Sequence, residues 1–306
     1  MAQKPTLKVG HIRITDHLIL GITKDKINKG TVLENLNLET SVYRGWNPLQ
    51  EDLRSGTVDA AFILAPIAME LFQNGIKLKL VLQAHKSGSV LIINKRANIE
   101  TLEDFKGKTI LIPHYLSVHH LLFDKLLRES GIPIGVTDVR FEVEAPSEIP
   151  EIIEWDEEGT VGGFIVAEPF GSQVVKAGYG DEFKLSKDIW PNHPCCVFVV
   201  RQEFIDSNKD GIQELVNNFV ASGQMVQEDI DSSAAVGAEF LDQEVDVIKR
   251  VLTDPPDRVI FNELLPVVDD YDYMQTYLTE TIKAMSGKID LDAFVDSTFA
   301  EKAGAA

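Results

Sequence analysis

Histidines concentrated in one short segment are the first residues of this sequence that could do chemistry. His114, His119 and His120 lie within PHYLSVHHLLFDKLLRESG, which follows the apolar run Thr109–Ile112. Apolar residues then recur mainly at spacings of three and four, which predicts a helix. Ser117 stands where its N-cap is expected, so two of the histidines fall in the first turn. Such a helix start presents unpaired N–H groups and a positive dipole end, which bind anions or polar ligand atoms.

A similar unit stands at the start of the chain, in GHIRITDHLILGITKDKI. An apolar run over Leu7–Ile14 predicts a strand, and Leu18–Lys26 predicts the helix behind it. Asp16 and His17 lie between them. Either residue could simply cap the helix, since aspartate is favourable at a helix start. The alternative is that the two units form the two sides of one ligand cleft.

Further candidates come from the predicted topology, because ligands of open α/β sheets bind beyond the carboxyl ends of the strands. The loops expected there are Thr15-Asp16-His17, Gly45-Trp46, Leu64-Ala65, Ser87-Gly88-Ser89, residues 114–119, Ala167-Glu168-Pro169 and residues 193–196. The candidate ligand-binding residues are His17, Trp46, Leu64, Ala65, Ser87, Gly88, Ser117, His119, Ala167, Glu168 and Cys196.

Several of these candidates have an ordinary structural explanation as well. Trp46 could be core packing, or a flat wall for a small ligand. His119 on an apolar helix could be a satisfied core histidine. Glu168 at a helix start is stabilised by the helix dipole in either case. Cys195 and Cys196 are most simply small buried hydrophobic residues.

Known catalytic and metal-binding patterns are absent from the sequence. It has no GxSxG, Walker loop, HExxH, CxxC pair or GxGxxG after a strand. His17, His114, His119, His120, His193, Glu168 and Cys196 could be assembled into a metal site, but without standard ligand spacing. A nucleophilic pair of Cys196 and His119 likewise has no local signature. We therefore expect no catalytic residues, no metal and no cofactor.

Short apolar runs alternate with helical patterns over the first two thirds of the chain, which predicts βα units around a parallel sheet. Further strands are expected at 38–43, 60–64, 78–84, 90–94, 109–112, 139–143, 162–166 and 196–200, and helices at 46–54, after Pro66, and at 101–104, 117–129, 148–155 and 168–177. From Gln202 onward strand patterns are scarce, and the apolar spacing predicts helices at 210–226, 230–241, 245–252, 272–285 and 291–298. This order indicates two lobes, residues 1–92 plus 200–306 and residues 93–199, joined by crossing strands at 90–94 and 196–200.

Composition excludes some classes of function. The 306 residues carry 29 basic and 48 acidic side chains, a net charge of −19, which argues against a nucleic-acid partner. No apolar run approaches the ~18 residues of a membrane span. The start MAQKPTLKVGHI has no export-signal pattern. We expect a cytoplasmic protein if the chain is complete, and a periplasmic or cell-surface one if a signal was removed. The two cysteines are adjacent and provide no disulfide framework.

The order of five segments resembles a known family. These are GHIRITDHLILGITKDKI, LRSGTVDAAFILAPIAMELF, TLEDFKGKTILIP, IVAEPFGSQVVKAG and WPNHPCCVFVV. In this order they resemble the ABC-transporter solute-binding proteins for nitrate, bicarbonate, sulfonate, taurine and thiamine-precursor pyrimidines. The resemblance implies a type II periplasmic-binding-protein fold. Each lobe would be a mixed sheet flanked by helices, with two hinge strands and a helical C-terminal tail.

Individual residues can be compared with the nitrate and bicarbonate binders. Trp46 is similar to their cleft tryptophan, and His119 to their ligand histidine by its place in the helix. Ala167 and Glu168 match the small residue and glutamate of their EP motif. The sequence departs at Cys196, because the tract after His-Pro is typically Glu-Lys in those proteins. Loss of that lysine removes a charge-assisted donor to an anion, which disfavours nitrate and bicarbonate.

The resemblance implies a substrate-binding component of an ABC importer that closes on a sulfonate, anion or small heterocycle. Its partners would be that ligand and the ABC permease and ATPase of the membrane, and the protein would be a monomer. The alternative is a cytoplasmic enzyme on the same fold, of the thiamine-pyrimidine or menaquinone-pathway type. The missing export signal keeps this alternative open.

Overall fold

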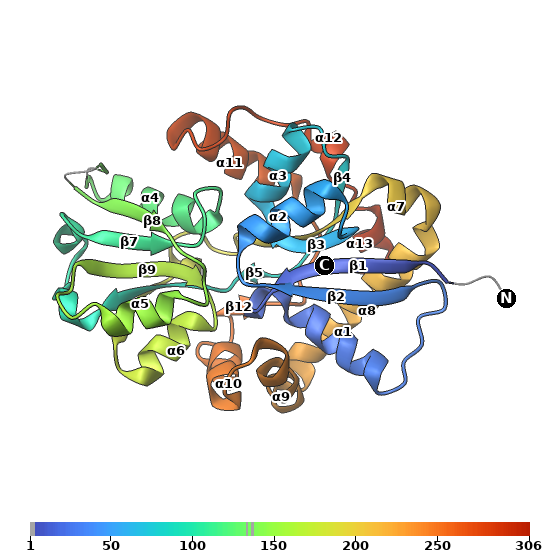
Figure 1. Ribbon diagram of the computed structural model, residues 1–306, viewed down its shortest axis with the longest axis horizontal. Helices are drawn as coiled ribbons and strands as arrows, with labels where there is room; N and C mark the ends of the chain where they lie inside the picture. The colour runs from blue at the N-terminus through green and yellow to red at the C-terminus, as the bar shows by residue number, and fades with distance from the viewer. Residues whose placement is uncertain (1–3, 133, 136–137) are drawn as a thin grey trace.

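Two five-stranded sheets lie side by side in the computed structural model, which describes residues 4–132, 134–135 and 138–306 (Figure 1). The first sheet has the order β2-β1-β3-β11-β4 and the second the order β10-β6-β9-β7-β8. The first contains β1 (Thr6–Ile12), β2 (Asn37–Tyr43), β3 (Ala60–Leu64), β4 (Leu78–Gln83) and β11 (Cys196–Arg201). The second contains β6 (Ser89–Asn94), β7 (Thr109–Ile112), β8 (Arg140–Val143), β9 (Val161–Ala167) and β10 (Gly180–Leu185).

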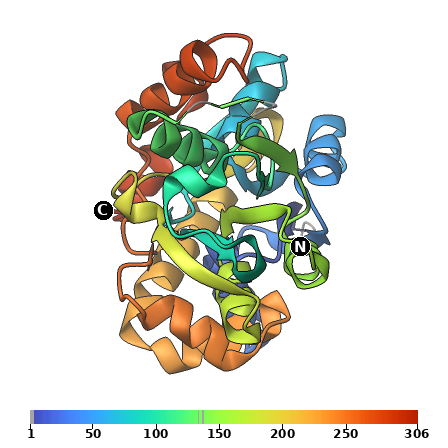
Figure 2. The same cartoon turned by 90° about the vertical axis from the view of Figure 1, so that its left-hand side faces the viewer.

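Helices cover both sheets, as the two perpendicular views show (Figure 2). The α-helices are α1 (Leu18–Asn28), α2 (Trp46–Ser55), α3 (Ala65–Gln73), α4 (Val118–Glu129), α5 (Ile149–Trp155), α6 (Phe170–Ala177), α7 (Gln202–Ser207), α8 (Lys209–Glu228), α9 (Ile230–Leu241), α10 (Val245–Thr253), α11 (Val268–Thr276), α12 (Leu291–Phe294) and α13 (Thr298–Lys302). Shorter turns are η1 (Thr15–His17), η2 (Lys95–Ala97), η3 (Leu102–Phe105), η4 (Ser186–Asp188) and the π-helical η5 (Tyr277–Thr281). None of the helices described is both long and apolar enough to cross a membrane.

Both sheets are mixed. In the first sheet β1 pairs in parallel with β2 and β3, whereas β11 runs antiparallel to β3 and β4. In the second sheet β7 is parallel to β8 and β9, and β6 is antiparallel to β9 and β10. The prediction of a parallel sheet from βα alternation was wrong for these antiparallel strands. The mixed sheets implied by the family resemblance are confirmed.

The strands that position the cluster described below are buried on both faces. β3 (AAFIL) and β7 (TILI) are buried along their whole length. Such short continuous apolar runs are expected where helices cover both sides of a sheet. The residues that directly follow β3 and β7, Ala65 and Pro113, are also buried.

The chain crosses between the sheets in two segments. It leaves the first sheet after β4 and enters the second at β6, and it returns between β10 and β11. β6 and β11, which were predicted to be the crossing strands themselves, each lie within one sheet, so the crossings come just before them. A two-stranded sheet adds to the first crossing, where β5 (Lys86–Ser87) pairs with β12 (Val259–Ile260) from the C-terminal part.

Local predictions of single elements differ from the structure in several places, and α7, β5 and β12 were also not predicted. β10 was not predicted, because GDEFKL is half exposed and lacks an apolar run. The single helices predicted at 272–285 and 291–298 are each interrupted. The first passes from α11 into the π-helical turn η5, and the second is divided into α12 and α13.

Candidate functional site

Polar side chains are concentrated where the two sheets meet. Asp16, His17, His85, His119 and His193 are all completely buried there. Burial of a polar group costs free energy unless it is hydrogen-bonded. A group of such residues at the junction of two sheets is therefore a candidate functional site.

Asp16 and His85 are at the centre of this cluster. Asp16 lies in η1, directly after β1, and His85 lies in the first crossing segment. His85 Nε2 is 2.9 Å from Asp16 Oδ2 and 3.2 Å from the backbone nitrogen of Cys196. One ring nitrogen cannot donate to the carboxylate and accept the amide proton together. The contact with the charged carboxylate is the stronger of the two.

The two cysteines adjoin this pair. Both are free and fully buried, and they stand at the end of the second crossing segment. The backbone fixes them to the first sheet, because Cys195 O accepts from Ala65 N at 3.0 Å and Cys196 O accepts from Ala84 N at 3.0 Å. The Cys195 and Cys196 thiols, an Asp16 carboxylate oxygen and a His85 ring nitrogen lie within 4.8 Å of one another.

His17 and Trp46 extend the cluster along the first sheet. His17 Nδ1 donates to the carbonyl of Ile12 at 2.9 Å, so its Nε2 points away from β1. The indole of Trp46, in the first turn of α2, lies edge-on to His17 with ring centroids 6.1 Å apart. His17 Nε2 and Trp46 Nε1 are buried, and neither has a hydrogen-bond partner among the residues described.

His119 comes from the second sheet's side of the junction. Ser117 caps α4 by accepting from His120 N at 3.1 Å, as predicted, and this cap places His119 in the first turn. His119 Nε2 is hydrogen-bonded to Ser89 Oγ at 2.9 Å. His119 Nδ1 has no partner in the described part of the chain.

Glu168 joins the two sheets. Its carbonyl accepts from both the amide and the hydroxyl of Thr15, each at 2.8 Å. Its carboxylate accepts from Ser172 N and Ser172 Oγ, both at 2.9 Å, and from Arg258 Nη1 at 2.7 Å. Arg258 also donates to Glu182 at 2.6 Å. The side chain of Glu168 is therefore fully satisfied without any ligand.

Burial and neighbouring charges shift the pKa values of the buried histidines in opposite directions. Burial, with help from His193 and His85, lowers the pKa of His119 to about 3. Burial also lowers the pKa of His193 to about 3. Burial alone would lower the pKa of His85, but the charge and hydrogen bond of Asp16 outweigh it and raise that pKa to about 10. At neutral pH the cluster thus contains neutral imidazoles at His119 and His193 beside a protonated His85.

The structure brings most predicted site residues to this junction. Ser87, Gly88 and Ser89 line the first crossing, where Ser87 N donates to His193 O and Gly88 O accepts from Glu168 N, both at 2.9 Å. Leu64, Ala65 and Ala167 take part through their backbone atoms. Leu64 and Ala167 are strand-pairing partners of Cys196 and Ser89, and the amide of Ala65 donates to the carbonyl of Cys195. Asp16, Cys195 and His193 were in the predicted loops but not among the candidate residues.

His85 and Arg258 were missed altogether. The partners of both are distant in the chain, Asp16 for His85 and Glu168 for Arg258. The only local signal for His85 was its position between a predicted strand and the turn SGS.

The mouth of the junction is an open pocket of ≈ 570 Å³. It is lined by the ends of β1 and β2, including Arg13 and Arg44, and on the opposite side by residues 146–148, Glu151 and Phe170. Ile12 lines this pocket and is hydrogen-bonded to His17, so the mouth adjoins the buried cluster.

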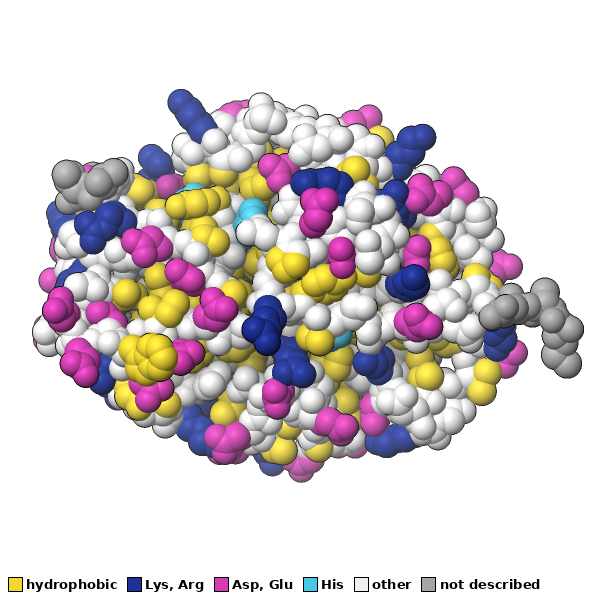
Figure 3. Space-filling model, in the orientation of Figure 1, with side chains coloured by type: hydrophobic (Ala, Val, Ile, Leu, Met, Phe, Trp, Pro, Cys, Tyr) yellow, Lys and Arg dark blue, Asp and Glu magenta, His cyan; other side chains and the backbone are white. Residues whose placement is uncertain are grey.

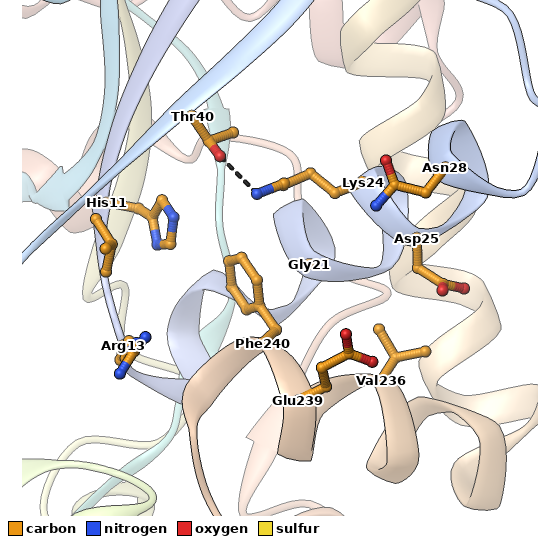
Figure 4. A pocket seen from close by; sticks show the side chains of 11 residues that line it. His11, Arg13, Gly21, Lys24, Asp25, Asn28, Thr40, Val236, Glu239 and Phe240 are labelled. Atoms are coloured by element: carbon orange, nitrogen blue, oxygen red, sulfur yellow. Dashed lines mark hydrogen bonds between the residues drawn. The ribbon is translucent and has the colours of Figure 1, made fainter.

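A second pocket, of ≈ 280 Å³, lies outside the junction between β1, α1 and α9 (Figure 4). The Phe240 ring stacks on His11 with centroids 4.7 Å apart, and it packs where a side chain on Gly21 would lie. Lys24 donates to Thr40 Oγ1 at 2.6 Å. The polar groups here are exposed or already paired, so this pocket is a weaker candidate than the buried cluster.

On the face shown in Figure 3, the charged side chains do not gather into a patch that could be a second binding site. Acidic and basic side chains are interspersed over both halves of that face (Figure 3). The net charge of −19 is thus spread out there and not gathered into one patch.

Relatives with curated names are nitrate and bicarbonate transport proteins. The nitrate import ATP-binding protein NrtC of Synechocystis sp. (strain ATCC 27184 / PCC 6803 / Kazusa) is 27% identical over 218 residues, 67% of this chain and 32% of that protein. The nitrate/nitrite binding protein NrtA of Nostoc sp. is 24% identical over 237 residues, 71% of this chain and 53% of that protein. The chain thus spans about a third to a half of the length of these relatives.

Solved structures with the same fold cover nearly the whole chain. One is the ligand-binding component of an ABC-type import system from Staphylococcus aureus with zinc bound. It has a TM-score of 0.88 and 27% identity, and the match covers 99% of this chain and 100% of that chain. The periplasmic nitrate-binding protein NrtA from Synechocystis PCC 6803 has a TM-score of 0.83 and 17% identity, covering 99% and 89%. Both are described as binding proteins and not as enzymes.

The family assignment rests on a match that covers most of the chain. The model of the NMT1-like family matches residues 1–239, which include both sheets and every member of the buried cluster named above except Arg258. The fold of the solved relatives agrees with this match. The chain therefore belongs to the NMT1-like family.

Proposed function

We propose that this protein is the substrate-binding component of an ABC-type importer and holds one small polar ligand between two lobes. Each lobe would contain one of the two sheets, and the lobes would meet at the two crossing segments, between β4 and β6 and between β10 and β11. The lobe bounds predicted from the sequence, 1–92 plus 200–306 and 93–199, instead fall inside β6 and β11. Motion at the two crossing segments would open and close the lobes. The names of the relatives support import, and they lend no support to the enzyme alternative.

One observation carries this proposal: several buried polar atoms without partners lie where the two sheets meet. They include Asp16 Oδ1, His17 Nε2, Trp46 Nε1, His85 Nδ1 and His119 Nδ1, each unpaired within the described chain. Each such group costs about 1–3 kcal/mol when left unpaired. A ligand that satisfies several of them would offset this cost.

Access to the cluster requires the lobes to part, because its side chains are completely buried. The open pocket lined by Arg13, Arg44, residues 146–148 and Glu151 would be the mouth through which the ligand enters. Closure would then bring Glu168 against Thr15 and bury the ligand.

The proposed partners are an ABC permease and its ATPase. NrtC, a relative that matches over 67% of this chain, is named as an ATP-binding import protein, which supports this kind of partner. The protein would act as a monomer on the side of the membrane from which the ligand is taken up. Cys195 and Cys196 provide no cationic donor, which disfavours nitrate and bicarbonate as ligands.

The test is a thermal-shift screen of the full chain against sulfonates, small anions, amino acids, pyrimidines and metal ions. A true ligand should raise the melting temperature by an amount that grows with its concentration. It should also reduce the radius of gyration in small-angle X-ray scattering. If no ligand does either and an assay finds catalytic turnover, the proposal is wrong.

A matched pair of variants locates binding in this screen. Trp46→Phe retains an aromatic ring but removes the buried Nε1–H, so it should reduce the ligand-induced shift. Trp155→Phe, at an exposed residue at the end of α5, should leave that shift unchanged. Equal shifts in both variants would place the ligand elsewhere.

A further inference from the structure

We propose that Asp16, His85, Cys195 and Cys196 bind one divalent transition-metal ion of the zinc class. This inference rests on the binding function proposed above, and it names the ion as the ligand over which the lobes close. The four side chains come from three separate segments of the chain, which the fold gathers at one point.

The spacing of the four donor groups suits a single small ion. One donor atom from each residue lies within 4.8 Å of the other three. Zinc bonds of about 2.0–2.3 Å in a tetrahedron separate neighbouring ligand atoms by roughly 3.3–3.8 Å. Only a small inward movement of the side chains is therefore needed to coordinate one ion.

An ordinary buried ion pair does not account for the cluster. The contact between His85 Nε2 and Asp16 Oδ2 leaves Asp16 Oδ1 and His85 Nδ1 buried with no hydrogen-bond partner in the described chain. These two atoms face the same point, because each lies 3.2 Å from where a Cβ on Gly88 would be. Gly88 has φ +90°, a conformation that favours glycine, and Val259 Cγ1 lies 3.1 Å from the same point, so the glycine lets the backbone approach both polar atoms closely.

The donor set selects the class of metal. Two sulfurs, one imidazole nitrogen and one carboxylate oxygen suit a borderline-soft ion with tetrahedral geometry, which is typical of zinc. Calcium and magnesium require mostly oxygen ligands and disfavour thiolates. Successive side chains of a strand point to opposite faces of the sheet, but Cys195 lies just before β11 begins. The two neighbouring thiols can therefore turn to the same side.

The placement of the donors links metal binding to closure. All four belong to η1, the start of β11 or the crossing segments, and the second sheet supplies none of them. All four are completely buried. An ion would therefore bind to the first sheet and the crossings while the lobes are open. Glu168 and His119 would then cover it on closure.

Metal stoichiometry of the full chain is the direct test. The protein, stripped with a chelator under reducing conditions, is dialysed against zinc and analysed by inductively coupled plasma mass spectrometry. We expect one zinc per chain. Cobalt(II) should give the near-ultraviolet thiolate-to-metal band of cysteine ligation together with tetrahedral visible bands. Absence of both results in the wild-type protein overturns the proposal, whether or not any variant folds.

Matched variants assign the ligands. Asp16→Asn and the double variant Cys195→Ala/Cys196→Ala should each weaken zinc binding more than about 100-fold, since even outer partners of metal ligands are worth 10–100-fold. Asp124→Asn and His120→Gln change a buried aspartate and a buried histidine outside the cluster, and should retain one zinc. Full zinc binding by the cluster variants would refute the assignment.

The same experiments separate this inference from the proposed function. If an organic compound stabilises and compacts the protein but zinc and cobalt do not bind, the metal site is refuted and the binding function stands. If zinc binds one per chain without reducing the radius of gyration, the ion is not the ligand over which the lobes close. If neither metals nor compounds bind, both proposals fail.

Discussion

The two sides of the buried junction differ in how completely their polar groups are paired. On the side of the first sheet and the crossings, Asp16, His17, Trp46 and His85 each have a buried polar atom without a partner in the described chain. On the side of the second sheet, the carboxylate of Glu168 is fully bonded, and His119 has a partner for one of its two nitrogens. The comparison supports the proposal that the first side holds a ligand and the second side covers it.

The largest expected effect is on the covering side. Arg258→Met removes the cation that pairs with Glu168, which is completely buried. Breaking a buried pair from one side leaves an uncompensated charge, which costs about 3–5 kcal/mol. Urea unfolding of the ligand-free protein should show a loss of this size.

The control for this prediction is a half-buried arginine that contacts the same acidic residue, Glu182. Arg250 is 32% exposed and lies 3.5 Å from Glu182. Arg250→Met should cost less than about 1 kcal/mol. Adding Glu168→Gln to Arg258→Met should recover much of the lost stability. Equal losses of unfolding free energy in the two arginine variants would show that the buried ion pair of Arg258 does not stabilise the contact between the sheets.

A smaller effect is expected from Ser89→Ala. This change removes the partner of His119 Nε2 and leaves both nitrogens of a buried imidazole unpaired. The expected cost is about 1–3 kcal/mol by urea unfolding. Ser207→Ala, at an exposed residue, should change stability by less than about 0.5 kcal/mol. If Ser89→Ala is equally neutral, the covering side does not hold His119 in place.

His119 should also make stability depend on pH. Its pKa is 6.5 in the unfolded chain and about 3 when folded, because burial opposes the charged form. Below pH 6.5 the unfolded chain therefore binds a proton that the folded protein does not. Stability should fall as pH drops from 6.5 towards 3, by up to about 1.4 kcal/mol per pH unit from this residue. His119→Gln should reduce the slope by that amount, and an unchanged slope would contradict a neutral buried His119.

The smallest effect is expected at the start of α4. Ser117→Ala removes the N-cap that accepts from His120 N, at a cost of about 1 kcal/mol. Ser130→Ala, at the exposed end of the same helix, should stay within about 0.5 kcal/mol of the wild type. A neutral Ser117→Ala would mean that the cap does not fix the turn that carries His119.

What could be predicted from the sequence was local. β3 was predicted with its observed bounds, and α4 was predicted with its cap at Ser117, because apolar periodicity and capping act within a few residues. β10 was missed, because its pairing with the distant β6 stabilises a segment that has no apolar run. Sheet direction was predicted only in part, since antiparallel pairing of β11 depends on the return from the second sheet.

The candidate site shows the same limit. His17, His119 and Glu168 could be named because strand ends and helix starts are visible in sequence. His85 could not, because the contact that defines it joins it to Asp16 across 69 residues. The expectation that the chain has no metal site came from the lack of ligand spacing. The proposed metal site is assembled from three distant segments, so it has no such spacing to detect.

A crystal structure of the protein with whatever ion or compound stabilises it tests the central claim most directly. The account predicts that the ligand lies between the two sheets, in contact with Asp16 and His85 on the first side and covered by His119 and Glu168 on the second. A ligand bound in the outer pocket beside Phe240, or one held mainly by side chains of the second sheet, would contradict it.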